Sequence, residues 1–321
     1  MKVTKAKMPR KLAVLLCLAA GVPVAMRAQE AGPIFRSRVA MVPISAVVRD
    51  SRGRAVTTLK VSDFEVRDNG ETRPILSFHT DNASPLTIAV LVDTSGSMRH
   101  ETKLAAARQV VSAITSELRP GIDSIGLFTF DSMLRELQTF TDRPTGLDTA
   151  LAGADPFGVT SLYDAIAETA RRIGAKPALR RAVVVLTDCV DTSSALAPAE
   201  VSGRASAIDV PVYIVATVPK IDQVDYTERS YAPGAQSTSD ARHLALWTGG
   251  DLLWATSDID AAAAGRMILS ELRHQYVIAV DSATDANWRR LEVKVRDRRM
   301  IVRARSGYFG RDNVVNAVPQ E

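Results

Sequence analysis

Oxygen-bearing side chains gather in one short stretch, Asp93-Thr94-Ser95-Gly96-Ser97, which directly follows the apolar run at residues 86–92. A continuous apolar run rich in β-branched residues predicts a strand that is covered on both faces. The motif therefore delivers a carboxylate and several hydroxyls to the carboxyl end of that strand. Since carboxylate and hydroxyl oxygens are hard ligands, the stretch predicts a site for a hard divalent cation.

Two further oxygen donors follow from the same reasoning. A second fully apolar strand is predicted at residues 182–186, and Asp188 comes just after it. Thr160 lies in the loop that opens the helix predicted at residues 161–173. Ligands of open parallel sheets bind at the carboxyl edge of the strands. We therefore expect one cluster of five ligands, formed by Asp93, Ser95, Ser97, Thr160 and Asp188.

Each of the five residues also has an ordinary interpretation when it is taken alone. The two aspartates would suit turns after strands, and Thr160 or its neighbour Ser161 would suit the cap of a helix. The combination at one sheet edge is what favours the metal site. Two interpretations of Asp191 remain open. It either belongs to the outer shell of the metal site or is a solvated acid in a loop. We expect His100 to be solvated, because Mg²⁺ prefers oxygen ligands.

The surrounding elements alternate between strands and helices. Strands are predicted at residues 86–92, 124–130, 182–186 and 210–218. Helices are predicted at residues 103–118, 161–173, 197–207, 240–248 and 259–273. This alternation predicts an α/β fold with a mainly parallel sheet, which we place at residues 85–271.

Antiparallel β segments flank this α/β domain at residues 38–80 and 272–309. In the first segment, Asn69-Gly70 predicts a tight turn between strands at residues 63–68 and 74–78. Because domain termini tend to lie close together, we expect the two segments to form one small β lobe, with two separate extensions as the alternative. Residues 219–239 are predicted to be an exposed excursion, and residues 310–321 a flexible tail.

The N-terminal residues have the pattern of a secretory signal peptide, which we place at residues 1–28 and follow with a linker at residues 29–37. Basic residues precede a short apolar segment, and no acidic residue occurs before Glu30. Cys17 lacks the small residues that a lipoprotein signal places before its cysteine, so we expect no stable membrane anchor. The sequence thus predicts an exported protein, periplasmic or extracellular.

The whole chain has a formal net charge of +4, but this excess belongs to the predicted signal peptide. Residues 1–28 hold six of the 40 Lys and Arg residues and none of the 36 Asp and Glu residues, which leaves 34 against 36, or −2. The remaining chain has no basic excess, so nucleic acid is not an expected partner.

The motif, together with Thr160 and Asp188, resembles the metal-ion-dependent adhesion site of the von Willebrand factor type A domain, a Rossmann-like α/β fold. The flanking β segments are similar to those of a bacterial exported subfamily of that fold. The resemblance implies that the two serines, and often the threonine, bind Mg²⁺ directly, while the aspartates act largely through water. Mn²⁺ would substitute, and Ca²⁺ fits less well. Cys189 departs from the family, which usually has glycine after the Thr-Asp pair.

Neutral hydroxyls leave the charge of a bound cation poorly neutralised, so an open coordination position would attract a carboxylate from a protein or extracellular ligand. We therefore expect a metal-dependent binding or adhesion module and not an enzyme. The alternatives are a Mg²⁺-dependent phosphohydrolase that uses Asp93 and a structural envelope subunit with a vestigial site. Ser95 argues against the hydrolase, because that chemistry usually places a second carboxylate at this position as general acid. The sequence contains no Gly-x-Ser-x-Gly motif, which argues against a serine hydrolase.

Overall fold

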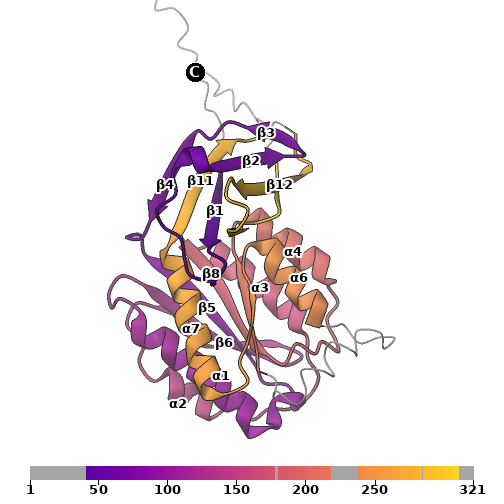
Figure 1. Ribbon diagram of the computed structural model, residues 1–321. Coiled ribbons are helices and arrows are strands. Elements are labelled where there is room, and N and C mark those ends of the chain that lie inside the picture. Colours follow the sequence, from indigo (N-terminus) through magenta and orange to yellow (C-terminus); the bar gives the residue numbers. More distant parts are fainter. Residues whose placement is uncertain (1–40, 178–179, 218–237, 284, 311–321) are drawn as a thin grey trace, which may run out of the picture. The chain divides into compact units, whose positions relative to one another are not determined.

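The computed structural model describes residues 41–177, 180–217, 238–283 and 285–310, all of which belong to one compact unit. The predicted signal peptide, linker and tail lie outside the described residues, apart from Gly310. Most of the predicted excursion at residues 219–239 also lies outside them. The described part consists of a central α/β region and an antiparallel β lobe (Figure 1).

The central sheet has six strands in the order β10-β9-β8-β5-β6-β7. Every neighbouring pair is parallel except β6 and β7. All eight residues of β5 are buried, which matches the prediction of a strand covered on both faces. The strands are β5 (Leu86–Asp93), β6 (Ser124–Phe130), β7 (Leu134–Thr141), β8 (Arg180–Thr187), β9 (Val212–Ala216) and β10 (Leu252–Trp254).

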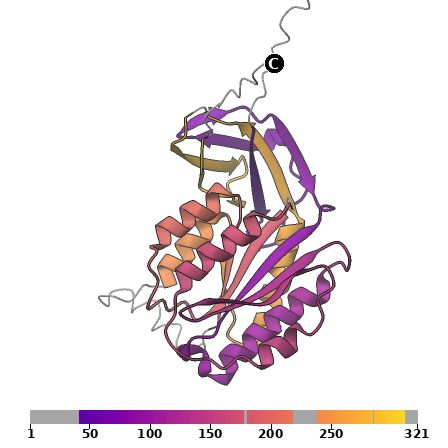
Figure 2. The ribbon, with the colours of Figure 1, turned by 180° about the vertical axis from the view of Figure 1, so that it is seen from behind.

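Helices cover both faces of this sheet (Figures 1 and 2). One apolar core lies between the sheet and α1 (Glu101–Glu117), α2 (Leu147–Ala152) and α7 (Asp258–Arg273). A second core lies between the opposite face and α3 (Leu162–Gly174), α4 (Pro198–Ala207) and α6 (Thr238–Thr248). Alternate residues of β5 enter the two cores, with Ile88 and Val90 in the first and Ala89 and Leu91 in the second.

The β lobe consists of two four-stranded sheets, and each combines strands from both ends of the described chain. The first has the order β13-β1-β11-β4, and the second β14-β12-β2-β3. The prediction of one lobe built from N- and C-terminal segments is therefore confirmed. The strands are β1 (Met41–Arg49), β2 (Phe64–Asp68), β3 (Glu71–Arg73), β4 (Ser77–Asp81), β11 (Gln275–Asp281), β12 (Trp288–Val295), β13 (Ile301–Arg303) and β14 (Gly307–Phe309).

Several elements differ from the sequence prediction. Asn69 and Gly70 have φ angles of 49° and 88°, as the predicted tight turn requires, but the turn joins β2 to β3. The strand expected at residues 74–78 begins later, as β4, and belongs to the other sheet. The short α2 and the polar edge strand β7 were not predicted, because neither has a clear apolar period.

The lobe joins the α/β region at the amino ends of the central strands. Arg180, the first residue of β8, is almost completely buried, and its guanidinium donates hydrogen bonds to the carbonyls of Asp81 and Leu272 at 3.0 and 3.1 Å. Asp81 is the last residue of β4, and Leu272 lies in the last turn of α7. Since β8 advances about 3.3 Å per residue, the lobe and the carboxyl edge of the sheet lie at opposite ends of that strand, roughly 20 Å apart.

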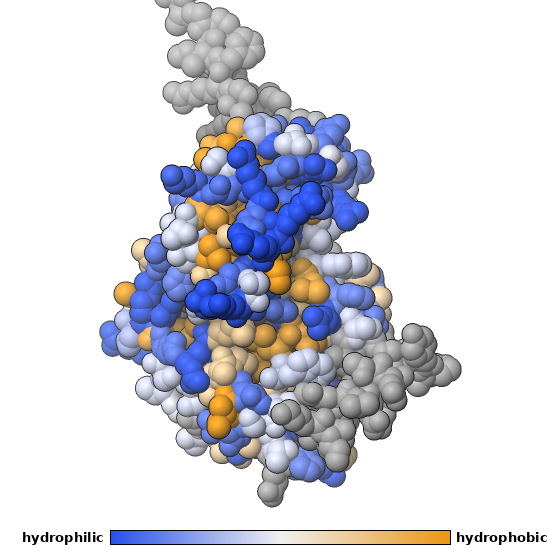
Figure 3. Space-filling model, viewed as in Figure 1, coloured by the Kyte–Doolittle hydropathy of each residue, from blue (hydrophilic) through white to orange (hydrophobic). Residues whose placement is uncertain are grey.

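Most apolar side chains of the described residues are used in three cores, one in the lobe and two beside the central sheet. On the face shown in Figure 3, hydrophilic side chains predominate, and the apolar ones that remain visible form separate patches. Among the described helices, none is both long enough and apolar enough to span a membrane.

A buried ionic cluster also connects the lobe to the α/β region. Glu271 of α7 is 2% exposed and forms ion pairs with Arg49 of β1 and Arg303 of β13. Arg303 also contacts Asp251 at 2.8 Å. Loss of one charge would leave the others buried without compensation, which is more costly than the loss of an exposed pair.

We therefore expect Glu271→Gln to lower the free energy of unfolding by about 3 kcal/mol, measured by chemical denaturation. Asp297→Asn is the control, because it removes an exposed pair with Arg299 and should leave stability nearly unchanged. Equal stability of both variants would show that the cluster does not hold the lobe.

Candidate metal centre

Asp93 ends β5 and is completely buried. Its carboxylate accepts a hydrogen bond from the Ser95 amide at 2.9 Å and another from the Thr187 hydroxyl at 2.6 Å. Thr187 is the last residue of β8, which pairs directly with β5. The side chain is therefore fixed by its own loop and by the neighbouring strand.

The Asp-x-Ser-x-Ser loop is shaped by short-range contacts. The Ser95 and Ser97 hydroxyl oxygens lie 3.1 Å apart, with Ser95 buried and Ser97 exposed. The amide of Thr94 donates to the carbonyl of Phe130 at 2.7 Å, and Met98 is buried below the loop. The two hydroxyls are thus held next to each other at the carboxyl end of β5.

Thr160 belongs to a second loop that is bonded to the first. The Gly96 amide donates to the carbonyl of Gly158 at 3.0 Å, and the Phe157 amide donates to the carbonyl of Thr94 at 2.9 Å. A Cβ atom on Gly96 would lie 3.2 Å from the Gly158 carbonyl oxygen, so a glycine allows this close approach. Thr160 itself is 3% exposed.

The first turn of α3 is capped from a third loop. The Asp191 carboxylate accepts from the Leu162 amide at 2.8 Å, and the Ser194 hydroxyl accepts from the Tyr163 amide at 2.9 Å. Asp191 is 8% exposed, so its interpretation as a solvated loop acid was wrong. Because Asp191 and Ser194 satisfy these amides, the helix does not require the Thr160 hydroxyl as its cap.

Asp188 follows β8 and is completely buried. The next residue, Cys189, has a φ of 65°, a left-handed conformation that favours glycine. This geometry gives a physical reason for the glycine that the family usually has here. The Cys189 side chain lies in the second core, and burial, followed by the charges of Asp188 and Asp93, raises the pKa of its thiol. The cysteine is therefore a filler of the core rather than a reactive thiol.

The buried position of Asp93 opposes its ionisation. Burial, followed by the nearby charge of Asp188, raises the pKa of the Asp93 carboxyl to about 6, although hydrogen bonds from Ser95 and Thr187 act in the opposite direction. A nearby cation would relieve this penalty, because opposite charge favours the ionised form.

Lys103 is a residue of this cluster that sequence reasoning missed. Its ammonium lies 2.7 Å from an oxygen of Asp188 and 3.0 Å from the carbonyl oxygen of Ser97. The sequence signal that could have indicated this role is the position of Lys103 at the start of the helix predicted after the motif. Sequence alone does not show which way that side chain turns. His100 is exposed and bonded to Thr102, as expected for a solvated residue.

The donor set fits a hard cation. It offers two buried carboxylates and a pair of serine hydroxyls, with Thr160 in an adjoining loop, and a cationic group of the chain already contacts one of the acids. The described residues contain no cluster of three or more His, Cys, Asp or Glu side chains that could hold a metal. Hydroxyl ligands are thus essential to the proposed site, and a softer metal such as Zn²⁺ would find no imidazole or thiolate set here.

Comparison with known families agrees with this architecture. Residues 88–192 match the von Willebrand factor type A domain. This stretch is similar to a von Willebrand factor type A domain. The match runs from β5 to the loop after β8 and includes all five predicted ligands, Asp93, Ser95, Ser97, Thr160 and Asp188. No curated protein matches the chain in sequence.

Solved structures with partial similarity include two from Bacteroides. An aerotolerance-related membrane protein of Bacteroides fragilis is 17% identical, with a TM-score of 0.47, over 58% of this chain and 98% of that one. BatB of Bacteroides thetaiotaomicron is 19% identical, with a TM-score of 0.45, over the same shares of the two chains. The PilB minor pilin of Streptococcus sanguinis is 13% identical, with a TM-score of 0.43, over 63% of each chain. Similarity at this level carries no argument about function.

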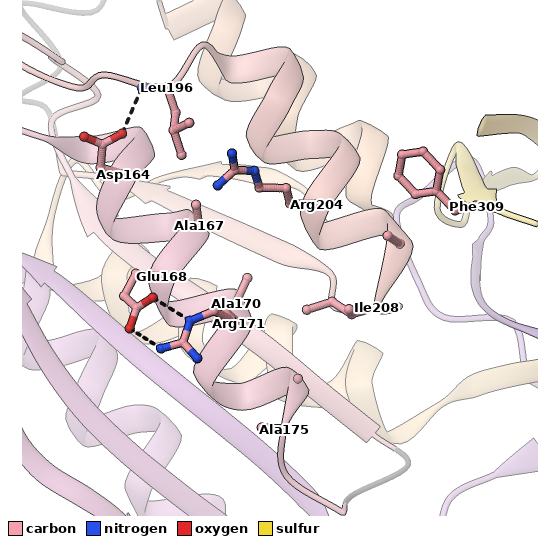
Figure 4. A pocket seen from close by; sticks show the side chains of 12 residues that line it. Asp164, Ala167, Glu168, Ala170, Arg171, Ala175, Leu196, Arg204, Ile208 and Phe309 are labelled. Carbon is pink, nitrogen blue, oxygen red and sulfur yellow. Dashed lines mark hydrogen bonds and ion pairs between the residues drawn. The ribbon is translucent and has the colours of Figure 1, made fainter. Parts of the chain in front are cut away.

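An apolar hollow of about 600 Å³ lies between α3 and α4 (Figure 4). Ala167, Ala170 and Ile208 line it, and Phe309 of the lobe borders it. It extends from Asp164 in the first turn of α3 to Ala175 beyond the end of that helix. None of the five candidate ligands is among the residues that line it.

The raised pKa of Asp93 gives a pH prediction for the protein in chelator. Between the ordinary pKa of 3.8 and the folded value of about 6, the unfolded chain loses the proton more readily, so stability falls as pH rises. Above pH 6 this loss in the free energy of unfolding is complete, and it is on the order of 2–3 kcal/mol. We expect Asp93→Asn to remove this slope in urea denaturation at pH 4–7. The same slope in both proteins would contradict the assignment.

Proposed function

We propose that the chain is an exported, cation-dependent interaction module in which Asp93, Ser95, Ser97, Thr160 and Asp188 hold Mg²⁺, with Mn²⁺ as a substitute. When bound, the cation supplies a Lewis-acidic position for a carboxylate oxygen of a partner protein or extracellular ligand. Export is inferred from the signal-like residues 1–28, which lie outside the described part of the chain.

One observation carries the proposal: two buried carboxylates stand at adjacent strand ends beside paired serine hydroxyls. Asp93 and Asp188 are both completely buried, and β5 pairs directly with β8. Buried charges require a compensating charge or a metal, because their removal from water is expensive. The hydroxyls add ligands without adding negative charge, so a divalent cation would keep an attraction for a further carboxylate.

The rim of the site also suits a protein partner. Phe157 and Val159 are 69% and 50% exposed, and they lie on the loop that carries Thr160. The Arg99 guanidinium lies 5.7 Å from the Phe157 ring centre and donates to the carbonyl of Pro156 at 3.0 Å. Exposed apolar side chains beside a charged anchoring point are typical of interaction sites. The rim therefore favours a partner acid that is flanked by apolar residues.

The hydrolase alternative is supported less well. An aspartyl nucleophile usually has a second carboxylate two residues later as general acid, and that position is Ser95. Asp93 is also completely buried, which restricts its attack on a substrate. The donor geometry thus favours cation binding over covalent catalysis.

The cation itself can be tested first. We expect Mg²⁺ or Mn²⁺ to raise the melting temperature, since about 100-fold excess over Kd stabilises a folded protein by about 2.7 kcal/mol. Chelator or Asp93→Ala should remove the gain, whereas the exposed Asp142→Ala should keep it. An unresponsive wild-type protein would contradict the site. Phosphatase turnover that depends on both Mg²⁺ and Asp93 would favour the enzyme instead.

The partner surface is tested by capture from an envelope extract in Mg²⁺, elution with chelator and mass spectrometry. We expect the double variant Phe157→Ser, Val159→Ser to capture less of the eluted protein while its melting temperature still responds to Mg²⁺. If capture survives chelator, or is unchanged in the double variant, the partner does not bind at the proposed metal site, and the proposal is contradicted.

A further inference from the structure

Lys103 reaches the metal centre from α1. Its side chain is 12% exposed, and that of Asp188 is 0% exposed. The ammonium donates to the Asp188 carboxylate at 2.7 Å and to the Ser97 carbonyl at 3.0 Å. Charge-assisted hydrogen bonds of this length between poorly hydrated partners are stronger than those between neutral groups. Lys103 thus holds together two of the loops that form the site.

We propose that Lys103 is an internal competitor of the divalent cation and that its ion pair with Asp188 sets how tightly the site binds metal. This inference rests on the proposed function, because it concerns the same site. It adds a residue that the five-ligand motif does not contain.

The charges of the site support the inference. Ionised Asp93 and Asp188 contribute two negative charges, and the Lys103 ammonium neutralises one of them at contact distance. A divalent cation near Asp188 must displace the ammonium or bind beside a positive charge. Both routes reduce the free energy of cation binding, because like charges repel more strongly in a poorly hydrated site than in water.

Neighbouring basic groups are engaged elsewhere. Arg99 contacts Pro156 and Phe157 of the rim loop, and the His100 ring is hydrogen-bonded to Thr102. The ion pair with Asp188 that the described residues contain is formed by Lys103. We therefore attribute the competition with the cation to this lysine and not to the summed charge of the neighbouring basic residues.

The ion pair has two opposite effects. Without metal it compensates a buried carboxylate and stabilises the folded chain, whereas it opposes the divalent cation. A lysine with only a structural role would lose stability and cation affinity together when replaced. A competitor loses stability in chelator but gains affinity, and this combination distinguishes the two roles.

The test compares Lys103→Met with the wild-type protein. Mn²⁺ alone is the probe, and the free ion is followed by electron paramagnetic resonance during titration. We expect Lys103→Met to bind Mn²⁺ about tenfold more tightly, or more, and to melt at a lower temperature in chelator. Lys103→Gln is the second variant, because it keeps a donor for the Ser97 carbonyl, and the same direction is expected.

Two controls separate contact from overall charge. Lys103→Arg keeps the positive charge and should bind Mn²⁺ as weakly as the wild type does. Arg108→Met removes a positive charge from the same helix, where the guanidinium donates to the Leu151 carbonyl, and should change Kd less than about twofold.

The outcomes distinguish the inference from the proposed function. Tighter binding by the neutral variants than by the wild type supports the competitor. Equal or weaker binding by the neutral variants overturns it and leaves the metal site intact. A tenfold gain in Arg108→Met also overturns it, because the effect would then be general. Absence of Mn²⁺ binding in every protein overturns both the competitor and the proposed function.

Discussion

The two buried carboxylates at the ends of β5 and β8 are the constraint on which the carboxyl edge of the central sheet depends. Asp93 and Asp188 lie at the ends of adjacent parallel strands, so their negative charges are brought together by the sheet itself. Both side chains are completely buried, and the raised pKa of Asp93 reflects that burial and the charge of Asp188. Such an arrangement requires positive charge nearby, from the chain or from a bound ion.

Three loops surround these acids at the carboxyl edge of the central sheet. The loop of Ser95 and Ser97 is bonded to the loop of Gly158, and Asp191 is used to cap α3. The chain's own cation, Lys103, engages Asp188. The paired serine hydroxyls beside these acids are arranged in a way that suits a hard divalent ion.

The rest of the molecule supports this edge from a distance. The β lobe is attached at the amino ends of the central strands through Arg180 and the cluster around Glu271, so it contributes stability but no ligand to the edge. The lobe needs both chain segments, because β1 pairs with β11 and β2 pairs with β12. The α/β region therefore lies in the chain between two β segments that pair with each other in the lobe.

The sequence by itself determined the buried central strands β5, β6, β8 and β9 and the residues that follow them. Apolar runs specify buried strands, alternation with helices specifies a parallel sheet, and a parallel sheet directs every carboxyl end to one edge. On these grounds Asp93, Ser95, Ser97, Thr160 and Asp188 are predicted to form one group. Tertiary structure alone decided the contact between Lys103 and Asp188, which are 85 residues apart, the cap provided by Asp191, and the sheet to which β4 belongs. Local periodicity reports which face of an element is buried, whereas these contacts depend on how distant elements pack and on the direction of individual side chains.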